Sequence, residues 1–170
     1  MRNLSIEVDF DRFPPEHTCD GGENISPPAI RVRGSDAPYL AVIVDDPDAP
    51  RGGTFTHWLV WNIPSTEIPP EGIPPEPPRV SRPVAAVQGT NDFRRIGYAG
   101  PPCPPRKGAS HRFFLRVWSV ERELDIPPPA RAVPHLRTRS RPPPPATGET
   151  MATYERRKVF ASTPGAGTRT

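Results

Sequence analysis

Proline is the residue that most constrains this chain, because 28 of its 170 residues are proline. Each proline fixes its own φ angle and has no backbone N–H to donate, so it is excluded from helix interiors and central strands. Eight prolines lie within residues 64–83 and eight more within residues 127–145. We expect the first segment to be a surface excursion of turns and polyproline-like coil, and the second to be irregular.

Regular structure must therefore lie in the remaining segments, which have the pattern of β-strands. Five runs that are rich in apolar, mostly β-branched or aromatic side chains are predicted strands: residues 4–10, 39–44, 57–63, 84–87 and 111–120. No long segment has the 3.6-residue apolar periodicity of a helix. The sequence predicts one mainly-β domain of the sandwich type over residues 1–160, followed by a flexible tail over residues 161–170.

Side-chain alternation predicts which residues of these strands share a face. One face of the last run is apolar: His111, Phe113, Leu115 and Val117. Its other face is mixed: Arg112, Phe114, Arg116 and Trp118. The same rule places His57 on the face of three apolar residues: Leu59, Trp61 and Ile63. The run 39–44 is apolar throughout, which predicts a strand that is buried on both faces.

The distribution of charge argues against a nucleic-acid partner, although the formal net charge of the chain is +3. Residues 1–124 contain 14 Lys and Arg against 16 Asp and Glu, whereas residues 125–170 contain 8 against 3. The basic excess belongs to the C-terminal part, so the body of the domain lacks the basic face that tracks phosphates. No apolar run approaches ~18 residues and no signal sequence is recognisable, which favours a cytoplasmic protein.

The two cysteines, Cys19 and Cys103, are far apart and neither belongs to a C-x-x-C motif. This spacing argues against a zinc knuckle or a thioredoxin-type redox site. The two thiols could pair with each other, or both could remain reduced and buried, and the sequence leaves both possibilities open.

Polar side chains gather where the predicted strands begin or end. Asp46 and Asp48 follow the run 39–44, His57 opens the next run, and His111 and Arg112 open the last one. If these ends converge, the carboxylates favour protonated imidazoles, and a protonated histidine beside an arginine makes a seat for an anionic oxygen. Turn formation alone is the alternative explanation for the two aspartates.

Six segments, in this order, resemble the successive signatures of the phosphatidylethanolamine-binding protein family, in its bacterial and archaeal Raf kinase inhibitor-like branch: Asp46-Pro-Asp-Ala-Pro50, His57-Trp-Leu-Val-Trp-Asn-Ile-Pro64, Gln88-Gly-Thr-Asn-Asp-Phe93, Gly97-Tyr98, Cys103-Pro-Pro105 and His111-Arg112. The similarity covers residues 4–126 and resumes near residues 153–156. It implies a large antiparallel sheet packed on a smaller one, with few short helices and proline-rich loops.

The resemblance also implies a ligand pocket. Asp46 and Asp48 match its acidic positions and His57 and His111 match its two histidines. Four residues match its rim: Tyr98, Gly100, Pro104 and Pro105. Arg112 and Phe113 adjoin the second histidine and complete the expected ligand-binding set. The implied function is non-enzymatic binding of phosphate-like or carboxylate groups, such as a phospholipid headgroup, with the histidines as donors, the aspartates as their orienters, and neither cofactor nor metal.

Two other functions are compatible with the same residues. Family members are known as kinase-pathway modulators and serine-protease inhibitors, so an exposed loop such as residues 64–83 could inhibit a kinase or protease, and bacterial relatives often form homodimers. Alternatively, Asp46, Asp48, His57 and His111 could hold a divalent metal and activate water in a hydrolase.

The chain departs from the family pattern at several positions. Arg94 and Ala99 each stand where the branch commonly has glycine, and the rim has one extra proline. Phe113 replaces a common tyrosine, which removes a hydroxyl group. Consecutive prolines at residues 142–145 exclude the helix that usually precedes the last strand.

Overall fold

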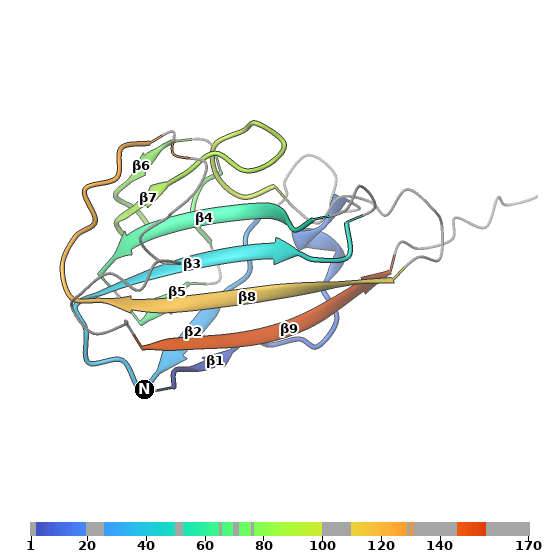
Figure 1. The fold of residues 1–170 in the computed structure, drawn as a ribbon, viewed down its shortest axis with the longest axis horizontal. Coiled ribbons are helices and arrows are strands. Elements are labelled where there is room, and N and C mark those ends of the chain that lie inside the picture. Colours follow the sequence, from blue (N-terminus) through green and yellow to red (C-terminus); the bar gives the residue numbers. More distant parts are fainter. Residues whose placement is uncertain are drawn as a thin grey trace, which may run out of the picture.

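The computed structural model describes residues 3–19, 26–49, 53–64, 66–69, 72–75, 77–99, 110–128, 130 and 146–155. Six strands form a large sheet in the order β6 (Arg79–Val80), β7 (Ala86–Gln88), β4 (Phe55–Ile63), β3 (Tyr39–Asp46), β8 (Ser110–Val120) and β9 (Thr147–Glu155). A smaller sheet has the order β1 (Ser5–Glu7), β2 (Ile30–Arg33) and β5 (Glu67–Ile68), and it lies behind the large one (Figure 1). Neighbouring strands run antiparallel in both sheets.

The mainly-β fold with two antiparallel sheets is thus confirmed. The only helical element within the described ranges is a short 3-10 turn, η1 (Pro15–His17). Among the residues that the structure places, no helix is long and apolar enough to cross a bilayer.

The main core lies between the two sheets. β2 contributes Ile30 and Val32 and exposes the arginines that alternate with them. Across the core, β8 buries the predicted face: His111, Phe113, Leu115 and Val117. The opposite face of β8 is partly or largely exposed: Arg112, Phe114, Arg116 and Trp118. The alternation predicted for this strand is therefore confirmed.

β3 lies at the centre of the large sheet and is buried at every residue after Tyr39. Its second face contributes Ala41 and Ile43 to a smaller apolar cluster on the outer side of the sheet. Leu124 packs against this cluster and exchanges two hydrogen bonds with the Asn62 side chain, of 2.8 and 3.1 Å. Apolar layers on both sides of β3 confirm that this strand is buried on both faces.

The prediction that His57 shares a face with Leu59, Trp61 and Ile63 is wrong. Leu59 and Trp61 lie on the outer side of the sheet, whereas Ile63 lies in the core between the sheets. The His57 ring also points to the inner side, where it packs edge-on against Phe113 with centroids 5.5 Å apart.

Two irregularities in β4 explain this outcome. Consecutive residues of β3 pair with Trp58 and Thr56, which leaves His57 as the extra residue of a β-bulge. A second register shift occurs near Asn62, whose φ of 56° is in the left-handed region. Each irregularity changes the face on which the following side chains lie, so simple alternation fails along this strand.

The proline-rich segment after β4 is anchored more firmly than the expected surface excursion. It contains β5, the third strand of the small sheet, and β6, which pairs with β7. Ile68 and Ile73 are buried in the main core. The buried Gln88 side chain donates hydrogen bonds to the carbonyl groups of Pro74 and Pro77, at 2.7 and 3.0 Å.

Other expectations concern parts of the chain that the structure describes only in part. Most of the proline-rich segment 127–145 and the whole tail 161–170 lie outside the described residues. Cys19 is disulfide-bonded, and Cys103 lies outside the described residues.

A glycine pair allows the packing next to the site to be tested. Gly97 has φ of 93°, and a Cβ atom there would overlap the Pro75 carbonyl group. Gly53 has φ of 87°, but its surroundings are open. We expect Gly97→Ala to lower the free energy of unfolding by about 2–5 kcal/mol, because left-handed strain and a backbone overlap both contribute. In urea denaturation, Gly53→Ala should lower the free energy of unfolding by only about 1–2 kcal/mol. Equal losses in the two variants would contradict the close approach of Gly97 to the Pro75 carbonyl group.

Candidate functional site

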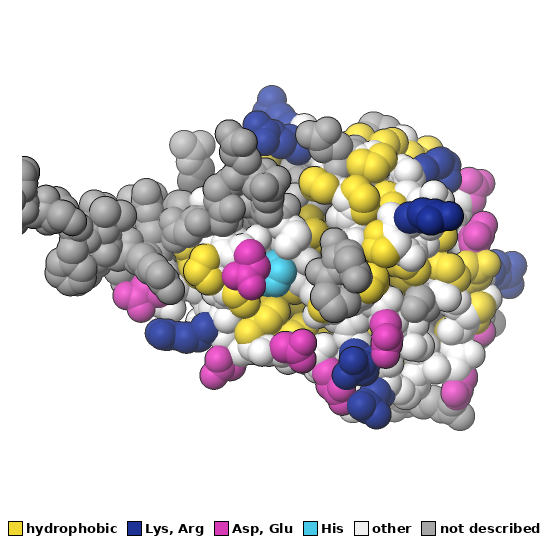
Figure 2. All heavy atoms as spheres, turned by 180° about the vertical axis from the view of Figure 1, so that it is seen from behind, with side chains coloured by type: hydrophobic (Ala, Val, Ile, Leu, Met, Phe, Trp, Pro, Cys, Tyr) yellow, Lys and Arg dark blue, Asp and Glu magenta, His cyan; other side chains and the backbone are white. Residues whose placement is uncertain are grey.

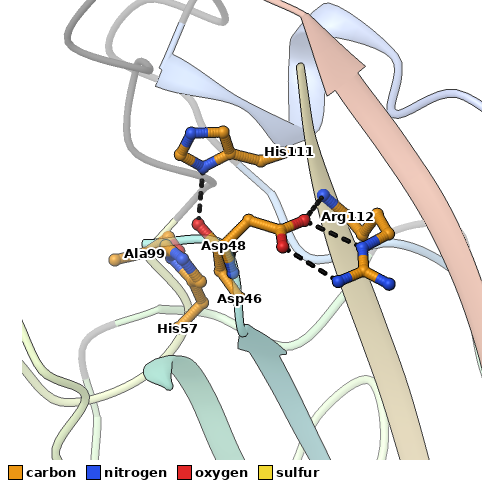
Figure 3. A network of polar contacts seen from close by, with 6 residues as sticks. All are labelled: Asp46, Asp48, His57, Ala99, His111 and Arg112. Carbon is orange, nitrogen blue, oxygen red and sulfur yellow. Dashed lines mark hydrogen bonds and ion pairs between the residues drawn. The ribbon is translucent and has the colours of Figure 1, made fainter. Parts of the chain in front are cut away.

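The candidate site lies where three strands of the large sheet meet. β3 ends at Asp46, and its antiparallel neighbours β4 and β8 begin near His57 and His111. Because an antiparallel strand starts where its neighbour ends, the pairing of the three strands brings these side chains together at one end of the strands. Figure 3 shows the resulting network, to which the loop after β3 adds Asp48 and the start of β8 adds Arg112.

The centre of the network is a buried hydrogen bond between Asp46 and His111. His111 Nδ1 lies 2.8 Å from Asp46 Oδ2, and the side chains are 9% and 0% exposed. The other carboxylate oxygen accepts the Asp48 backbone N–H at 2.7 Å, which fixes the orientation of the carboxylate. An ionised Asp46 only accepts hydrogen bonds, so the proton is on Nδ1 and the neutral ring presents an accepting Nε2. Protonation of Nε2 turns that atom into a donor.

Asp48 is paired with Arg112 rather than with a histidine. The guanidinium group donates to both carboxylate oxygens at 2.9 and 3.0 Å, and the Arg112 backbone N–H donates at 2.9 Å. The side-chain hydrogen bonds from Arg112 lower the pKa of Asp48 to about 2. The expectation that both aspartates orient histidines therefore holds only for Asp46, and Asp48 connects the loop after β3 to the start of β8.

His57 is fully buried and is oriented by the backbone. Its Nδ1 lies 3.1 Å from the Ala99 carbonyl oxygen, and the Ala99 N–H donates to the His57 carbonyl group at 3.1 Å. Three aromatic rings surround the imidazole: Phe55, Phe113 and Phe93, with centroids 5.0, 5.5 and 5.8 Å away. These two hydrogen bonds between His57 and Ala99 join β4 to the loop that contains Ala99. The same loop leads to the residues of the expected rim.

Two further predicted site residues, Tyr98 and Phe113, are buried. The Tyr98 hydroxyl donates to the His17 carbonyl oxygen at 2.6 Å, and burial raises the pKa of this phenol. Phe113 is fully buried and its ring contacts Phe13, His57 and His111. Phe113 therefore supports both histidine rings from the core, whereas Tyr98 joins its loop to the His17 backbone. Three predicted rim residues lie outside the described ranges: Gly100, Pro104 and Pro105.

Sequence reasoning missed the aromatic side of this site. Phe55 and Phe93 contact each other with ring centroids 4.7 Å apart, and both contact the His57 ring. The signal was present, because Phe93 ends one of the recognised motifs and Phe55 lies two residues before His57. From the side opposite to Figure 1, a histidine is visible at the surface next to acidic and hydrophobic side chains (Figure 2).

The described residues do not favour a metal centre. Within them, no group of three or more His, Cys, Asp or Glu side chains is arranged to hold a metal ion. Asp48 is engaged by Arg112, and the Nδ1 atoms of both histidines are engaged by Asp46 or Ala99. The metal-dependent hydrolase alternative therefore has no support in the part of the chain that the structure describes.

Comparison with known proteins agrees with the geometry. The family model described as phosphatidylethanolamine-binding protein matches residues 6–168. A UPF0098 protein from Pyrococcus abyssi is 45% identical over 133 residues, which cover 76% of this chain and 72% of that protein. The crystal structure of Escherichia coli YbcL has a TM-score of 0.70 and 27% identity, and the match covers 90% of this chain and 98% of YbcL.

A phosphatidylethanolamine-binding protein homologue from Chlamydia trachomatis has a similar crystal structure, with a TM-score of 0.69 and 27% identity, covering 92% of this chain and 99% of that one. The family match spans both sheets and every described residue of the candidate site. The chain therefore belongs to the phosphatidylethanolamine-binding protein family and has bacterial and archaeal relatives.

Proposed function

We propose that the site at Asp46 and His111 binds a phosphate-like or carboxylate group and releases it chemically unchanged. The observation that carries the proposal is the buried hydrogen bond of 2.8 Å between Asp46 and His111 Nδ1. It holds the ring so that Nε2 is the atom left for a ligand. When Nε2 is protonated, it donates a charge-assisted hydrogen bond, which is the strong kind for an anionic oxygen.

The charge balance of the site favours an anion only when the histidine carries a positive charge. Asp46 and Asp48 carry two negative charges, and Arg112 neutralises one of them through its bidentate pair. A protonated His111 neutralises the other, so the four groups sum to zero and do not repel an anion. With a neutral His111 the same groups carry one negative charge. In this proposal the site therefore accommodates an anion with His111 in its protonated form.

The arrangement supports recognition better than covalent catalysis. An aspartate bonded to histidine Nδ1 is two thirds of a hydrolytic triad, in which the histidine activates a serine or cysteine. Among the described residues, however, no serine, threonine or cysteine side chain hydrogen-bonds to His111. The inhibitory alternative stays a prediction, and the anchoring of Ile68 and Ile73 in the core gives it no support as a free loop.

The proposed anion site at Asp46 and His111 can be tested by titrating the protein with ligand. Inorganic phosphate and phosphorylethanolamine should shift the His111 ring signals in NMR spectra, and the signal shifts should saturate as either ligand is added. His111→Gln should weaken binding roughly tenfold or more, because a hydrogen bond to a charged group is lost. Arg31→Gln removes an exposed cation on β2 and should leave the affinity unchanged. If neither the His57 nor the His111 ring signals respond to either ligand, the proposed anion site is ruled out.

The Asp48 pair gives an acid-range prediction. Because Arg112 depresses the folded-state pKa of Asp48 from 3.8 to about 2, this carboxylate stabilises the fold above pH 3.8 and loses that contribution as the pH falls towards 2. Arg112→Gln should raise the Asp48 pKa towards 3.8 and weaken phosphate binding, because Asp48 loses its counter-charge. Carboxyl NMR titration measures this shift. As a control, Arg33→Gln removes the similarly exposed ion pair with Glu7 and should leave the Asp48 pKa unchanged. If the Asp48 pKa is also unchanged in Arg112→Gln, the pairing of Asp48 with Arg112 is contradicted.

A further inference from the structure

A groove lies on the outer side of the large sheet, away from the proposed anion site. It has a volume of about 430 Å³, and residues of the N-terminal segment, β8 and β9 line it. Its β8 residues, Arg116 and Trp118, belong to the face opposite to that of His111. They also lie roughly 17–24 Å further along the strand than His111. The groove is therefore a separate candidate site, on the face of β8 and β9 that is turned toward the viewer in Figure 1.

The backbone gives this groove a fixed frame. The Leu4 N–H donates to the Thr147 carbonyl group at 2.9 Å, which joins the N-terminal segment to the edge of β9. Gly148 lies so close to this segment that a Cβ atom there would overlap the Leu4 carbonyl oxygen. Trp118 packs against the outer apolar cluster and also lines the groove. A site whose walls are fixed in this way needs little further ordering when it binds a ligand.

The charged side chains at the groove sum to −1. Arg116 donates to Asp45 through Nη1 at 2.7 Å and to Glu149 through Nε at 2.6 Å. Asp45 is fully buried and compensates Arg116, so the charge of Glu149, which is 47% exposed, is in excess. Within the described ranges no other Lys or Arg lines the groove. An excess of negative charge in a groove favours a cation and disfavours an anion.

Trp118 determines which kind of cation fits. Across β8 and β9, Trp118 pairs with Thr147 and Arg116 pairs with Glu149. Trp118 and Glu149 are therefore diagonal neighbours on one face, a spacing of roughly 7–8 Å that one ligand can span. A guanidinium group is planar, stacks on aromatic rings and donates to carboxylates, so it can contact both side chains at once.

We propose that this groove binds a guanidinium group, supplied either by a small arginine-like molecule or by an arginine side chain of another protein. The group stacks on Trp118 and donates to Glu149 Oε1, the carboxylate oxygen that Arg116 does not engage. Asn3 and Thr147 also line the groove and supply further hydrogen-bond acceptors. This site shares no residue with the proposed anion site, so either can fail while the other stands.

The first test compares Nα-acetylarginine amide with Nα-acetylcitrulline amide, which has nearly the same shape but no charge. Trp58 and Trp61 are fully buried, so the Trp118 ring signals in NMR spectra report on the groove. The arginine compound should shift these signals saturably. Calorimetry should show that the citrulline compound binds roughly tenfold more weakly or worse, because a charge-assisted hydrogen bond and the stacking of a cation are both lost.

Variants test the two residues that contact the ligand. Glu149→Gln should weaken binding of the arginine compound roughly fivefold or more, because the excess negative charge is removed. Trp118→Leu should weaken it roughly 2- to 5-fold, whereas Trp118→Phe keeps a ring and should retain most of the affinity. Glu7→Gln is the matched control and should leave the affinity unchanged. Glu7 is 42% exposed and accepts a hydrogen bond of 2.6 Å from Arg33 Nε, as Glu149 does from Arg116 Nε.

Two further compounds distinguish the sources of the guanidinium group. Tighter binding of an acetylated and amidated Gly-Arg-Gly peptide than of propylguanidine supports an arginine of another protein, whereas equal or weaker binding of the peptide supports a small molecule. The inference is overturned if the citrulline compound binds as tightly as the arginine compound, or if Glu149→Gln leaves the affinity unchanged. It is also overturned if no guanidinium compound shifts the Trp118 signals.

Discussion

The pairing of β3 with β4 and β8 is the constraint on which both the core and the site depend. In this register Tyr39 faces Val120 and Asp45 faces Phe114, so Asp46 at the end of β3 meets His111 at the start of β8. Side chains alternate with a period of two, and a slip of one residue would therefore turn Arg112 inward and His111 outward. The apolar residues that follow along β8 would leave the core in the same slip. Packing of the core thus fixes the register, and the register assembles the site.

Consecutive aspartates at the end of a buried strand create an electrostatic problem that β8 resolves. Asp45 and Asp46 are fully buried, and they point to opposite faces of the sheet. Asp46 is bonded to His111, while Asp45 accepts a 2.7 Å hydrogen bond from Arg116 on the outer side. A buried carboxylate without a partner costs several kcal/mol, so removing either partner is expected to destabilise the fold as well as the site. The alternation along β8 supplies one partner to each face.

The sequence predicted the parts of this arrangement that depend on local pattern. The burial of residues 39–44 followed from their continuous apolar run, and the two faces of residues 111–120 followed from alternation. The sequence also placed five polar residues at strand ends, but it left their convergence as a condition: Asp46, Asp48, His57, His111 and Arg112. The orientation of His57 did not follow, because a β-bulge is a property of two paired strands and leaves no mark in one of them. The partner of His57, the Ala99 carbonyl group, was also hidden, since every residue has a carbonyl. The short β5 and β6 have two residues each, too few for any periodicity.

The two parts of the proposed site differ in what controls them. The proposed anion site depends on two ionic hydrogen-bonded pairs, Asp46 with His111 and Asp48 with Arg112. The aromatic contacts of His57 with Phe55 and Phe93 depend instead on backbone geometry, because hydrogen bonds to the Asn91 side chain and the Thr56 backbone fix the turn that carries Phe93. His57 packs against three rings, and one of them, Phe113, also contacts the His111 ring, so the core side chain of Phe113 joins the two histidines.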